Sequence, residues 1–338
     1  MKISKLTVLN IKIQCYYYNI MFCLRIRRSF KSKRLSNIIL TLCLPYFLIR
    51  WGILKLIDHI LIQKTEKIKQ KNICFKYPLG IVAICKNEGY YIKEWIEYHK
   101  LIGINRFYIY DNESEDDTKT ILTPYIESNI VSYTYFPGKS KQLEAYNDAI
   151  RRAKNECKYL AFIDLDEFIY FDNKNENLYN YIDNLIKSHK GACGIGLNWC
   201  IFGSSNKIEK EEGLVIERFL YSSYAKRGYN HHIKTICNPR MVKDYISPHF
   251  PLYKLGAFSI NENGQRLYAW YNVINQYEHL RINHYFTKSK AEFLRKRARG
   301  LADRIGIYDL QQFDKYDLND TYDDSMLYYA NKINQKKE

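Results

Sequence analysis

Residues 159–168 read YLAFIDLDEF and join a buried-strand pattern to closely spaced carboxylates. The apolar run 159–163 is continuous, as in a strand that a parallel sheet buries on both faces. Asp164 and Asp166 follow it one residue apart. Open α/β sheets bind ligands at the carboxyl ends of their strands, and Mg²⁺ and Mn²⁺ prefer carboxylate oxygens. The stretch therefore predicts an α/β fold with a metal–diphosphate site, although a solvated strand end would show the same triplet.

The chain from residue 77 onward alternates strand-like and helix-like segments. The segments that suit strands are 81–85, 106–110, 130–136, 159–163 and 194–198. Helical periodicity begins after Asn87, which can cap that helix, and recurs over 142–154 and about 288–303. This alternation predicts a Rossmann-like, doubly wound and mostly parallel sheet. Residues 311–338 are polar and are expected to form a peripheral tail.

The positive charge of the chain is concentrated near its N-terminus. Residues 1–76 hold 16 Lys and Arg but only two acidic residues, a net charge of +14 out of +16 for the chain. The remainder carries +2, so the basic stripe of a nucleic-acid binder is absent from the predicted fold. No nucleic-acid partner is expected. Salt-sensitive binding to duplex DNA, without binding to anionic liposomes, would instead favour a nucleic-acid partner for this basic segment over a lipid partner.

Within residues 1–76, basic clusters alternate with apolar runs. The run 38–49 ends at Arg50 and is shorter than the roughly 20 residues of a spanning helix. No small-residue cleavage site follows it. The pattern favours a helical extension that lies on an anionic membrane surface, with a helical pair packed on the catalytic domain as the alternative. The nine scattered cysteines lack a C-x-x-C motif, which suits reduced thiols, so we expect a cytoplasmic protein on the cytosolic face.

Polar side chains follow the first two predicted strands and share the sheet edge at which Asp164 lies. They can cap helices or bind a nucleoside. The predicted nucleotide contacts at these strand ends are Asn87, Glu88, Asp111, Asn112 and Asp116. Three polar strand ends on one edge outline a nucleotide pocket.

A series of short motifs resembles the GT-A glycosyltransferases, with the closest match in the family 2-like and family 92 group. The motifs, in chain order, are 83–88, 94–99, 103–104, 110–116, 142–147, 164–168, 199–204, 234–239, 283–289 and 296–300. The resemblance spans about residues 78–303. It implies a catalytic domain over residues 77–310, between the basic segment 1–76 and the tail 311–338.

The resemblance implies sugar transfer from a nucleotide-sugar donor, expected to be UDP-linked, to a glycan or lipid-linked acceptor. It also implies Mn²⁺ or Mg²⁺ and inversion at the anomeric carbon. Asp166 is expected to bind the metal directly, and Asp164 to contact the ribose or a metal-bound water. His284 is either a third metal ligand or a core histidine. Lys288 contacts a phosphate or merely begins a helix.

The base that deprotonates the acceptor stays open in the sequence. The acidic pair that usually supplies it in family 2 is not evident. The candidates are Glu217, Asp244, His231, His232 and His249. Trp199 suits an acceptor platform or, more commonly, a core position.

Two other functions compete with the transferase. A phosphatase of the haloacid-dehalogenase type also uses D-x-D after a strand, but it wants Thr or Val where Phe168 stands, and on the first strand. A non-catalytic membrane-associated scaffold of the same fold would not need Asp164, Asp166 and His284.

Overall fold

The computed structural model describes residues 33–70, 73–172, 176–273, 279–298 and 311–336, with backbone only for most of 33–51. The chain divides into two compact units. One comprises residues 1–71 with 254–257, and the other comprises 72–253 with 258–338. The first 32 residues of the predicted basic segment lie outside the described part.

The described part of the first unit contains the long helix α2 (Lys33–Lys69), which continues through Pro45 and Arg50. Where its side chains are described, several large apolar residues are exposed: Ile49, Ile53, Leu56, Ile57 and Ile60. None of the described helices, α2 included, is long and apolar enough to cross a membrane. The expected helical extension is therefore confirmed over Lys33–Lys69.

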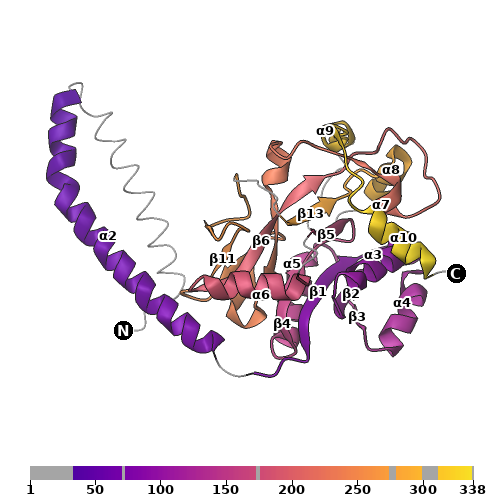
Figure 1. Cartoon of the computed structure of the whole chain (residues 1–338), viewed down its shortest axis with the longest axis horizontal. Coiled ribbons are helices and arrows are strands. Elements are labelled where there is room, and N and C mark those ends of the chain that lie inside the picture. The colour runs from indigo at the N-terminus through magenta and orange to yellow at the C-terminus, as the bar shows by residue number, and fades with distance from the viewer. Residues whose placement is uncertain (1–32, 71–72, 173–175, 274–278, 299–310, 337–338) are drawn as a thin grey trace. The chain divides into compact units, whose positions relative to one another are not determined.

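The second unit is organised around one large twisted sheet (Figure 1). Its strands, in spatial order, are β12 (Arg266–Leu267), β11 (Phe258–Ile260), β6 (Ala192–Ile201), β8 (Ile233–Cys237), β4 (Cys157–Phe162), β1 (Tyr77–Cys85), β2 (Arg106–Asp111) and β3 (Val131–Tyr135). The strand β13 (Leu280–His284) pairs in parallel with β6 and in antiparallel with β5 (Glu167–Phe171). The strands β4, β1, β2 and β3 run parallel, while β8 is antiparallel to β4 and β6. The predicted α/β fold with a mostly parallel sheet is confirmed.

Helices and two small two-stranded sheets also belong to this unit. The helices are α3 (Gly89–Leu101), α4 (Thr118–Glu127), α5 (Gln142–Ala153), α6 (Leu178–Ser188), α7 (Val215–Arg218), α8 (Lys290–Ala298), α9 (Gln312–Tyr316) and α10 (Leu327–Gln335), with 3₁₀ turns η1 (Gly228–His231) and η2 (Pro239–Met241). One small sheet is the hairpin of β9 (Val242–Tyr245) and β10 (Pro251–Tyr253), and the other pairs β7 (Tyr221–Ser222) with β14 (Thr321–Tyr322), which are far apart in the chain.

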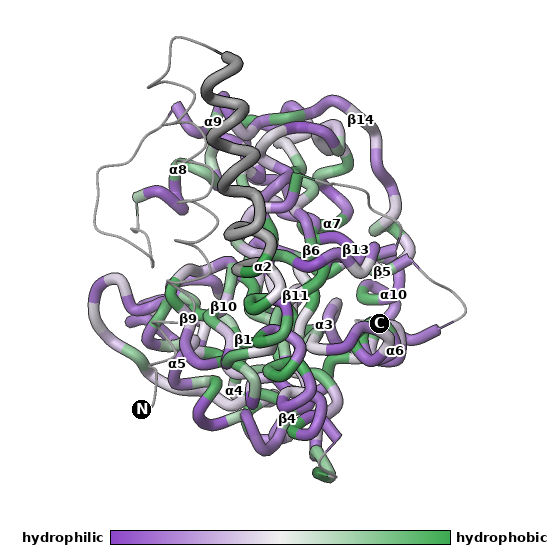
Figure 2. The backbone as a smooth tube through the Cα atoms, turned by 90° about the vertical axis from the view of Figure 1, so that its left-hand side faces the viewer, coloured by the Kyte–Doolittle hydropathy of each residue, from purple (hydrophilic) through white to green (hydrophobic). Residues whose placement is uncertain are grey.

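The sheet buries both faces, as its continuous apolar strands require. Side chains alternate along β1, so Ile81 and Ala83 enter the larger core beneath α3, while Val82 and Ile84 enter the smaller core beneath α5. In Figure 2, which is coloured by residue hydropathy, hydrophobic and hydrophilic stretches alternate along the chain. Helices on both faces hold the strand ends rigidly, and those ends carry the candidate site.

Two local expectations are wrong. Asn87 does not cap α3, because Glu88 occupies the cap position, and the Asn87 side chain instead accepts a hydrogen bond from the Glu115 amide. Residues 311–338 do not form a peripheral tail, because Ala330 and Ile333 of α10 are buried in the larger core. The polar residues of that segment conceal a short apolar helix face.

Candidate functional site

Asp164 and Asp166 lie in the short connection between β4, which ends at Phe162, and β5, which begins at Glu167. The Asp164 amide donates a hydrogen bond to Oε2 of Glu167 at 2.9 Å, which closes the turn. The turn therefore presents the two aspartates at the carboxyl end of β4, where the sequence predicts them.

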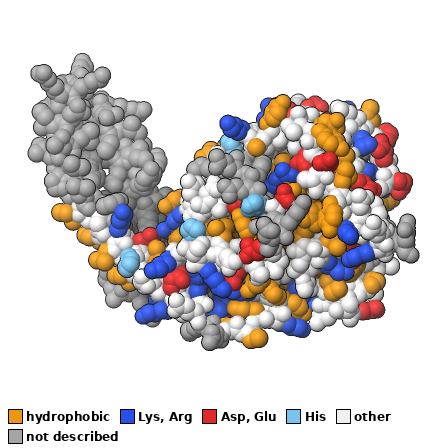
Figure 3. Space-filling view, in the orientation of Figure 1, with side chains coloured by type: hydrophobic (Ala, Val, Ile, Leu, Met, Phe, Trp, Pro, Cys, Tyr) orange, Lys and Arg blue, Asp and Glu red, His pale blue; other side chains and the backbone are white. Residues whose placement is uncertain are grey.

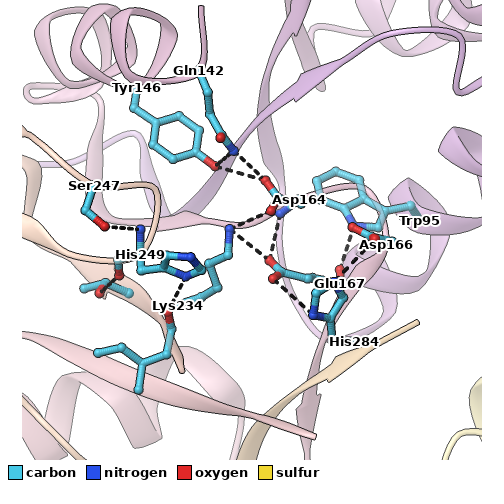
Figure 4. Close-up of polar contacts among 12 residues, drawn as sticks. Trp95, Gln142, Tyr146, Asp164, Asp166, Glu167, Lys234, Ser247, His249 and His284 are labelled. Atoms are coloured by element: carbon cyan, nitrogen blue, oxygen red, sulfur yellow. Dashed lines mark hydrogen bonds and ion pairs between the residues drawn. The ribbon is translucent and has the colours of Figure 1, made fainter. Parts of the chain in front are cut away.

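A buried lysine from β8 lies beneath this turn (Figure 4). The Lys234 side chain is fully buried, and its Nζ lies 2.8 Å from Oδ2 of Asp164 and 3.4 Å from Oε2 of Glu167. Burial opposes ionisation of Asp164, but the positive charge of Lys234 lowers its pKa. Gln142 at the start of α5 also donates to Asp164, at 2.7 Å. Asp164 is therefore an oriented carboxylate.

Asp166 lies among cationic groups. Its Oδ2 contacts the ammonium of Lys296 on α8 and lies 3.4 Å from Nε2 of His284 at the end of β13. Burial opposes ionisation of Asp166, but Lys296 and His284 hold its pKa well below the usual range. Asp166 is thus a carboxylate at any physiological pH and suits a metal ion or a cationic side chain.

The pair of Asp166 and His284 fits a divalent cation. Nδ1 of His284 is buried, lacks a hydrogen-bond partner among the described residues, and lies 3.9 Å from Oε1 of Glu167, which also lacks one. Nε2 of His284 and Oδ2 of Asp166 face each other at 3.4 Å, so one cation could be bound by both groups, with the Glu167 carboxylate near the other ring nitrogen.

Asp164 does not join that pair as a third ligand. Within the described ranges, no group of three or more His, Cys, Asp or Glu residues is arranged to hold a metal. Magnesium is commonly held by one or two carboxylates together with substrate phosphates and water. Two protein ligands therefore suit a cation that a diphosphate helps to bind.

A cavity of about 300 Å³ adjoins Asp166 through Lys296, which lines it. The lining residues come from the ends of β1 and β2 and from α3 and α8: Asn87, Glu88, Tyr90, Tyr91, Glu115, Asp116, Lys288, Glu292, Arg295 and Lys296. Four predicted donor contacts, Asn87, Glu88, Asp116 and Lys288, are thus brought together. One side of the cavity therefore carries acidic and amide side chains, and the other side carries the cations of α8 and of the turn before it.

Two lining residues have left-handed backbone conformations. Asn87 and Lys288 both have φ of 52°. Asn tolerates this region, whereas a lysine in it is strained. Strain of this kind persists only where the surrounding structure holds it, and it is common at ligand sites. Lys288 is buried, and burial together with the charge of Lys296 lowers the pKa of its ammonium. Such a cation gains from a bound anion.

The Glu292 carboxylate in the cavity wall is already neutralised. It accepts two hydrogen bonds from the Arg218 guanidinium, at 3.0 and 2.9 Å, and one from the Tyr91 hydroxyl at 2.8 Å. Burial opposes its ionisation, but the bonds from Arg218 and Ser289 outweigh burial and lower its pKa to about 2. Glu292 therefore fixes α8 without repelling an anionic ligand from Lys288 and Lys296.

The loop after β2 is held by its own side chains. Asp111 accepts hydrogen bonds from the Ser114 amide and the Tyr133 hydroxyl, and Asn112 donates to the Phe136 carbonyl oxygen. Neither Asp111 nor Asn112 lines the cavity. Asp116 does so, while it also accepts bonds from the Gly89 amide and from Thr118 at the start of α4. A nucleoside-binding role for this loop stays a prediction.

The candidate bases are widely separated in the fold. Glu217 on α7 accepts hydrogen bonds from the Leu214 amide and from Asn334 of α10. Asp244 lies on the β9 hairpin, half-exposed beside Lys243. His249 lies next to Lys234 (Figure 4). Of the three, the structure brings only His249 to the turn that carries Asp164.

The sequence did not single out Lys234 or Glu167 as site residues. A lysine inside the apolar run of β8 is the signal for the first, because a fully buried lysine requires a carboxylate partner. Glu167 gave no signal of its own, since the neighbours that surround it come from β8 and β13.

Figure 3 shows acidic, basic and histidine side chains intermingled on the visible face of this unit.

The glycosyltransferase family 92 model matches residues 85–304, more than half of the chain. The chain belongs to glycosyltransferase family 92. The match includes the D-x-D turn, Lys234, His284 and Lys296, so the candidate site lies inside the family's shared region. The predicted family is confirmed.

Curated family 92 proteins of plants share part of this region. A Ricinus communis protein is 31% identical over 130 residues, which are 38% of this chain and 23% of that protein. An Oryza sativa protein is 32% identical over 128 residues, 36% of this chain and 22% of that protein. The aligned region spans about a quarter of the length of these relatives.

Solved structures resemble part of this chain at low similarity. S. aureus TarS 1-349 in complex with UDP-GlcNAc is 16% identical with a TM-score of 0.33, over 48% of this chain and 46% of that chain. Glucosyl-3-phosphoglycerate synthase from Mycobacterium tuberculosis in complex with Mn²⁺, UDP and glucosyl-3-phosphoglycerate is 15% identical with a TM-score of 0.29, over 54% and 62%. Likeness at this level carries no argument about ligands.

Proposed function

We propose that this family 92 protein transfers a sugar from a nucleotide-sugar donor, UDP-linked by preference, to a hydroxyl of a glycan or lipid-linked acceptor, with inversion. One observation carries the proposal: the Asp166–His284 pair adjoins a cavity that Lys288, Arg295 and Lys296 line. A nucleoside diphosphate carries several negative charges, and this is the cluster of cations that can meet them. The acidic and amide groups across the cavity can accept hydrogen bonds from ribose hydroxyls.

Asp166 and His284 would hold Mn²⁺ or Mg²⁺, which neutralises charge on the leaving diphosphate when bound. Asp164, fixed by Lys234 and Gln142, is placed to accept a hydrogen bond from the donor. Lys296 contacts Asp166 in this structure, and a bound diphosphate offers its ammonium a second anionic partner. Preorganised cations of this kind stabilise a transition state in which charge moves onto the leaving group.

We also propose peripheral attachment to the cytosolic face of a membrane through the first unit. The support is the exposed apolar series along α2, together with the net charge of +14 over residues 1–76. Apolar insertion and attraction to anionic lipid act together in interfacial helices. A lipid-linked acceptor would be reached from such a position.

The test of the proposed activity is a panel of UDP-, GDP- and dTDP-sugars incubated with the full chain and Mn²⁺. Release of the nucleoside diphosphate is measured with and without EDTA. We expect one donor group to be turned over, and EDTA to abolish its turnover. Absence of turnover across the panel, or full activity in EDTA, would contradict the proposed function or its metal dependence respectively.

A further inference from the structure

A wall of stacked rings extends from the Asp166–His284 pair to the protein surface. Trp199 on β6 lies 4.4 Å from His284, measured between ring centroids, and it stacks on His232 at 4.9 Å with an interplanar angle of 19°. His232 in turn stacks on Trp270 at 5.2 Å and 28°. Trp199 is almost fully buried, whereas Trp270 is 45% exposed. The stack therefore runs from the candidate metal pair outward.

The outer end of the wall is fixed to the sheet. The Ile233 amide of β8 donates to the Trp270 carbonyl oxygen at 3.2 Å, and the Asn272 amide donates to the His231 carbonyl oxygen at 2.8 Å. The Asn198 side chain of β6 donates to the Asn272 carbonyl oxygen and accepts a hydrogen bond from the Asn272 side-chain amide. Trp270 is thus held in place although nearly half of its surface is exposed.

His249 lies against this wall in a defined tautomer. Its ring is 5.2 Å from that of Trp199 and 5.6 Å from that of His232. Nδ1 lies 3.1 Å from the Ile233 carbonyl oxygen, and a carbonyl only accepts, so Nδ1 carries the hydrogen. Nε2 of the neutral ring therefore keeps its lone pair.

The surroundings of His249 favour that neutral form. Burial, with the positive charge of Lys234, lowers the pKa of the imidazole to about 3. The neighbouring carbonyl and the Thr235 hydroxyl, which donates to the His249 carbonyl oxygen at 2.8 Å, fix the ring's backbone. At physiological pH the ring is therefore neutral, and it is a weaker base than a free histidine.

We infer that the Trp199–His232–Trp270 wall is the acceptor subsite for a carbohydrate, and that His249 is the base that removes the proton of its attacking hydroxyl. The inference rests on the proposed transferase function. A sugar ring has an apolar C–H face, which the exposed part of Trp270 can cover, and a polar rim, which directs one hydroxyl at a base. Among the candidate bases, His249 lies beside both the ring wall and Lys234.

The step balances in atoms and electrons. The acceptor O–H bond breaks and its proton passes to Nε2 of His249. The oxygen forms a bond to the anomeric carbon of the donor, and the bond from that carbon to the β-phosphate oxygen breaks. Its electron pair leaves with the nucleoside diphosphate, and the imidazolium returns its proton to water.

The wall is tested by saturation-transfer NMR on the full chain with methyl glucoside, galactoside, mannoside and N-acetylglucosaminide. We expect at least one glycoside to receive saturation from the wild type, and Trp270→Ala to abolish it. Tyr268→Ala is the matched control, because this neighbour is 82% exposed and lies outside the stack. If no glycoside shows saturation that depends on Trp270, the acceptor subsite is overturned. This readout needs no donor, so it stands apart from the proposed function.

The base is tested by transfer from the donor found in the panel to the glycoside found by NMR. His249→Ala should lower the transfer rate about 100-fold or more, leave metal-dependent UDP binding unchanged, and recover part of its activity when imidazole is added. His189→Ala, at the end of α6, should match the wild type. Transfer by His249→Ala within a few-fold of the wild type, or a loss that imidazole does not relieve, would overturn the role of His249. If the wild type itself does not bind UDP in the presence of the metal, the result counts against the proposed donor site and not against His249.

Discussion

At the residue scale, the site depends on charges that are paired before any ligand arrives. Lys234 forms ion pairs with Asp164 and Glu167, Lys296 with Asp166, and Arg218 with Glu292. An unpaired buried charge would destabilise the fold, so each pair both permits burial and orients a group for the ligand. The side chains of the Arg218–Glu292 pair are almost completely buried, and the lowered pKa of Glu292 makes its contribution to stability depend on pH.

Glu292→Gln should remove a pH-dependent part of the stability. The folded protein lowers the Glu292 pKa from 4.5 to about 2, so the contribution of the carboxylate is complete above about pH 4.5 and is lost as pH falls toward 2. The wild type should therefore be more stable than the variant at pH 7, with a gap that narrows below pH 4.5. Urea unfolding between pH 3 and 7 measures this gap. Glu144→Gln, at an exposed carboxylate, should show little difference, and a constant gap for Glu292→Gln would contradict the pairing.

The same scale shows why part of the site was predictable. Asp164, Asp166 and Lys288 stand in local patterns, a strand end and a helix start, which sequence reveals. Lys234 and Glu167 gain their meaning only when β8 and β5 meet beneath the turn. Pairings between distant strands follow from packing, which a single sequence does not state.

At the element scale, the short terminal helix contributes to the catalytic unit's core. Ile333 of α10 is 3% exposed and belongs to the larger core with residues of α3. Ile333→Ala should lower the free energy of unfolding by about 2–5 kcal/mol, because it leaves a cavity. Tyr328→Ala on the exposed face of the same helix should have a small effect. Equal effects in urea titrations would show that α10 does not pack as described.

The exposed face of α2 carries the membrane proposal. Ile53, Leu56 and Ile60 recur at helical spacing, and all are more than half exposed. The full chain should co-sediment with anionic liposomes at low salt, and Ile53→Asp combined with Leu56→Asp and Ile60→Asp should weaken this strongly. Gln63→Asp serves as the reference for the effect of one added negative charge on the same helix. Failure of the wild type to co-sediment, or undiminished binding by the triple variant, would leave α2 with another role.

Elements were more predictable than their partners. The strands over β1, β2, β3, β4 and β6 follow from continuous apolar runs, and their alternation with helices predicts the sheet. β5 was not predicted, because its first residues belong to the acidic motif and read as a loop. α10 was hidden by a polar composition in which only Ala330 and Ile333 are buried.

At the scale of the whole molecule, the sheet brings three parts of one reaction together. The ends of β1 and β2 form the acidic wall of the cavity, β4 and β13 supply the candidate metal pair, and β6 with β8 carries the ring wall. The proposed donor, metal and acceptor sites thus lie along one edge of the sheet. The central claim is that Asp166 holds the cation that binds the donor's diphosphate.

Calorimetry of UDP binding with Mn²⁺, for the wild type and for Asp166→Asn, tests that claim most directly. Asp172→Asn is the matched control, because it removes an exposed carboxylate just beyond the other end of β5. We predict that Mn²⁺ strengthens UDP binding by the wild type and the control, and that Asp166→Asn lowers metal-dependent affinity at least about tenfold while melting as the wild type does. Equal metal-dependent affinity in Asp166→Asn and the wild type would contradict the account.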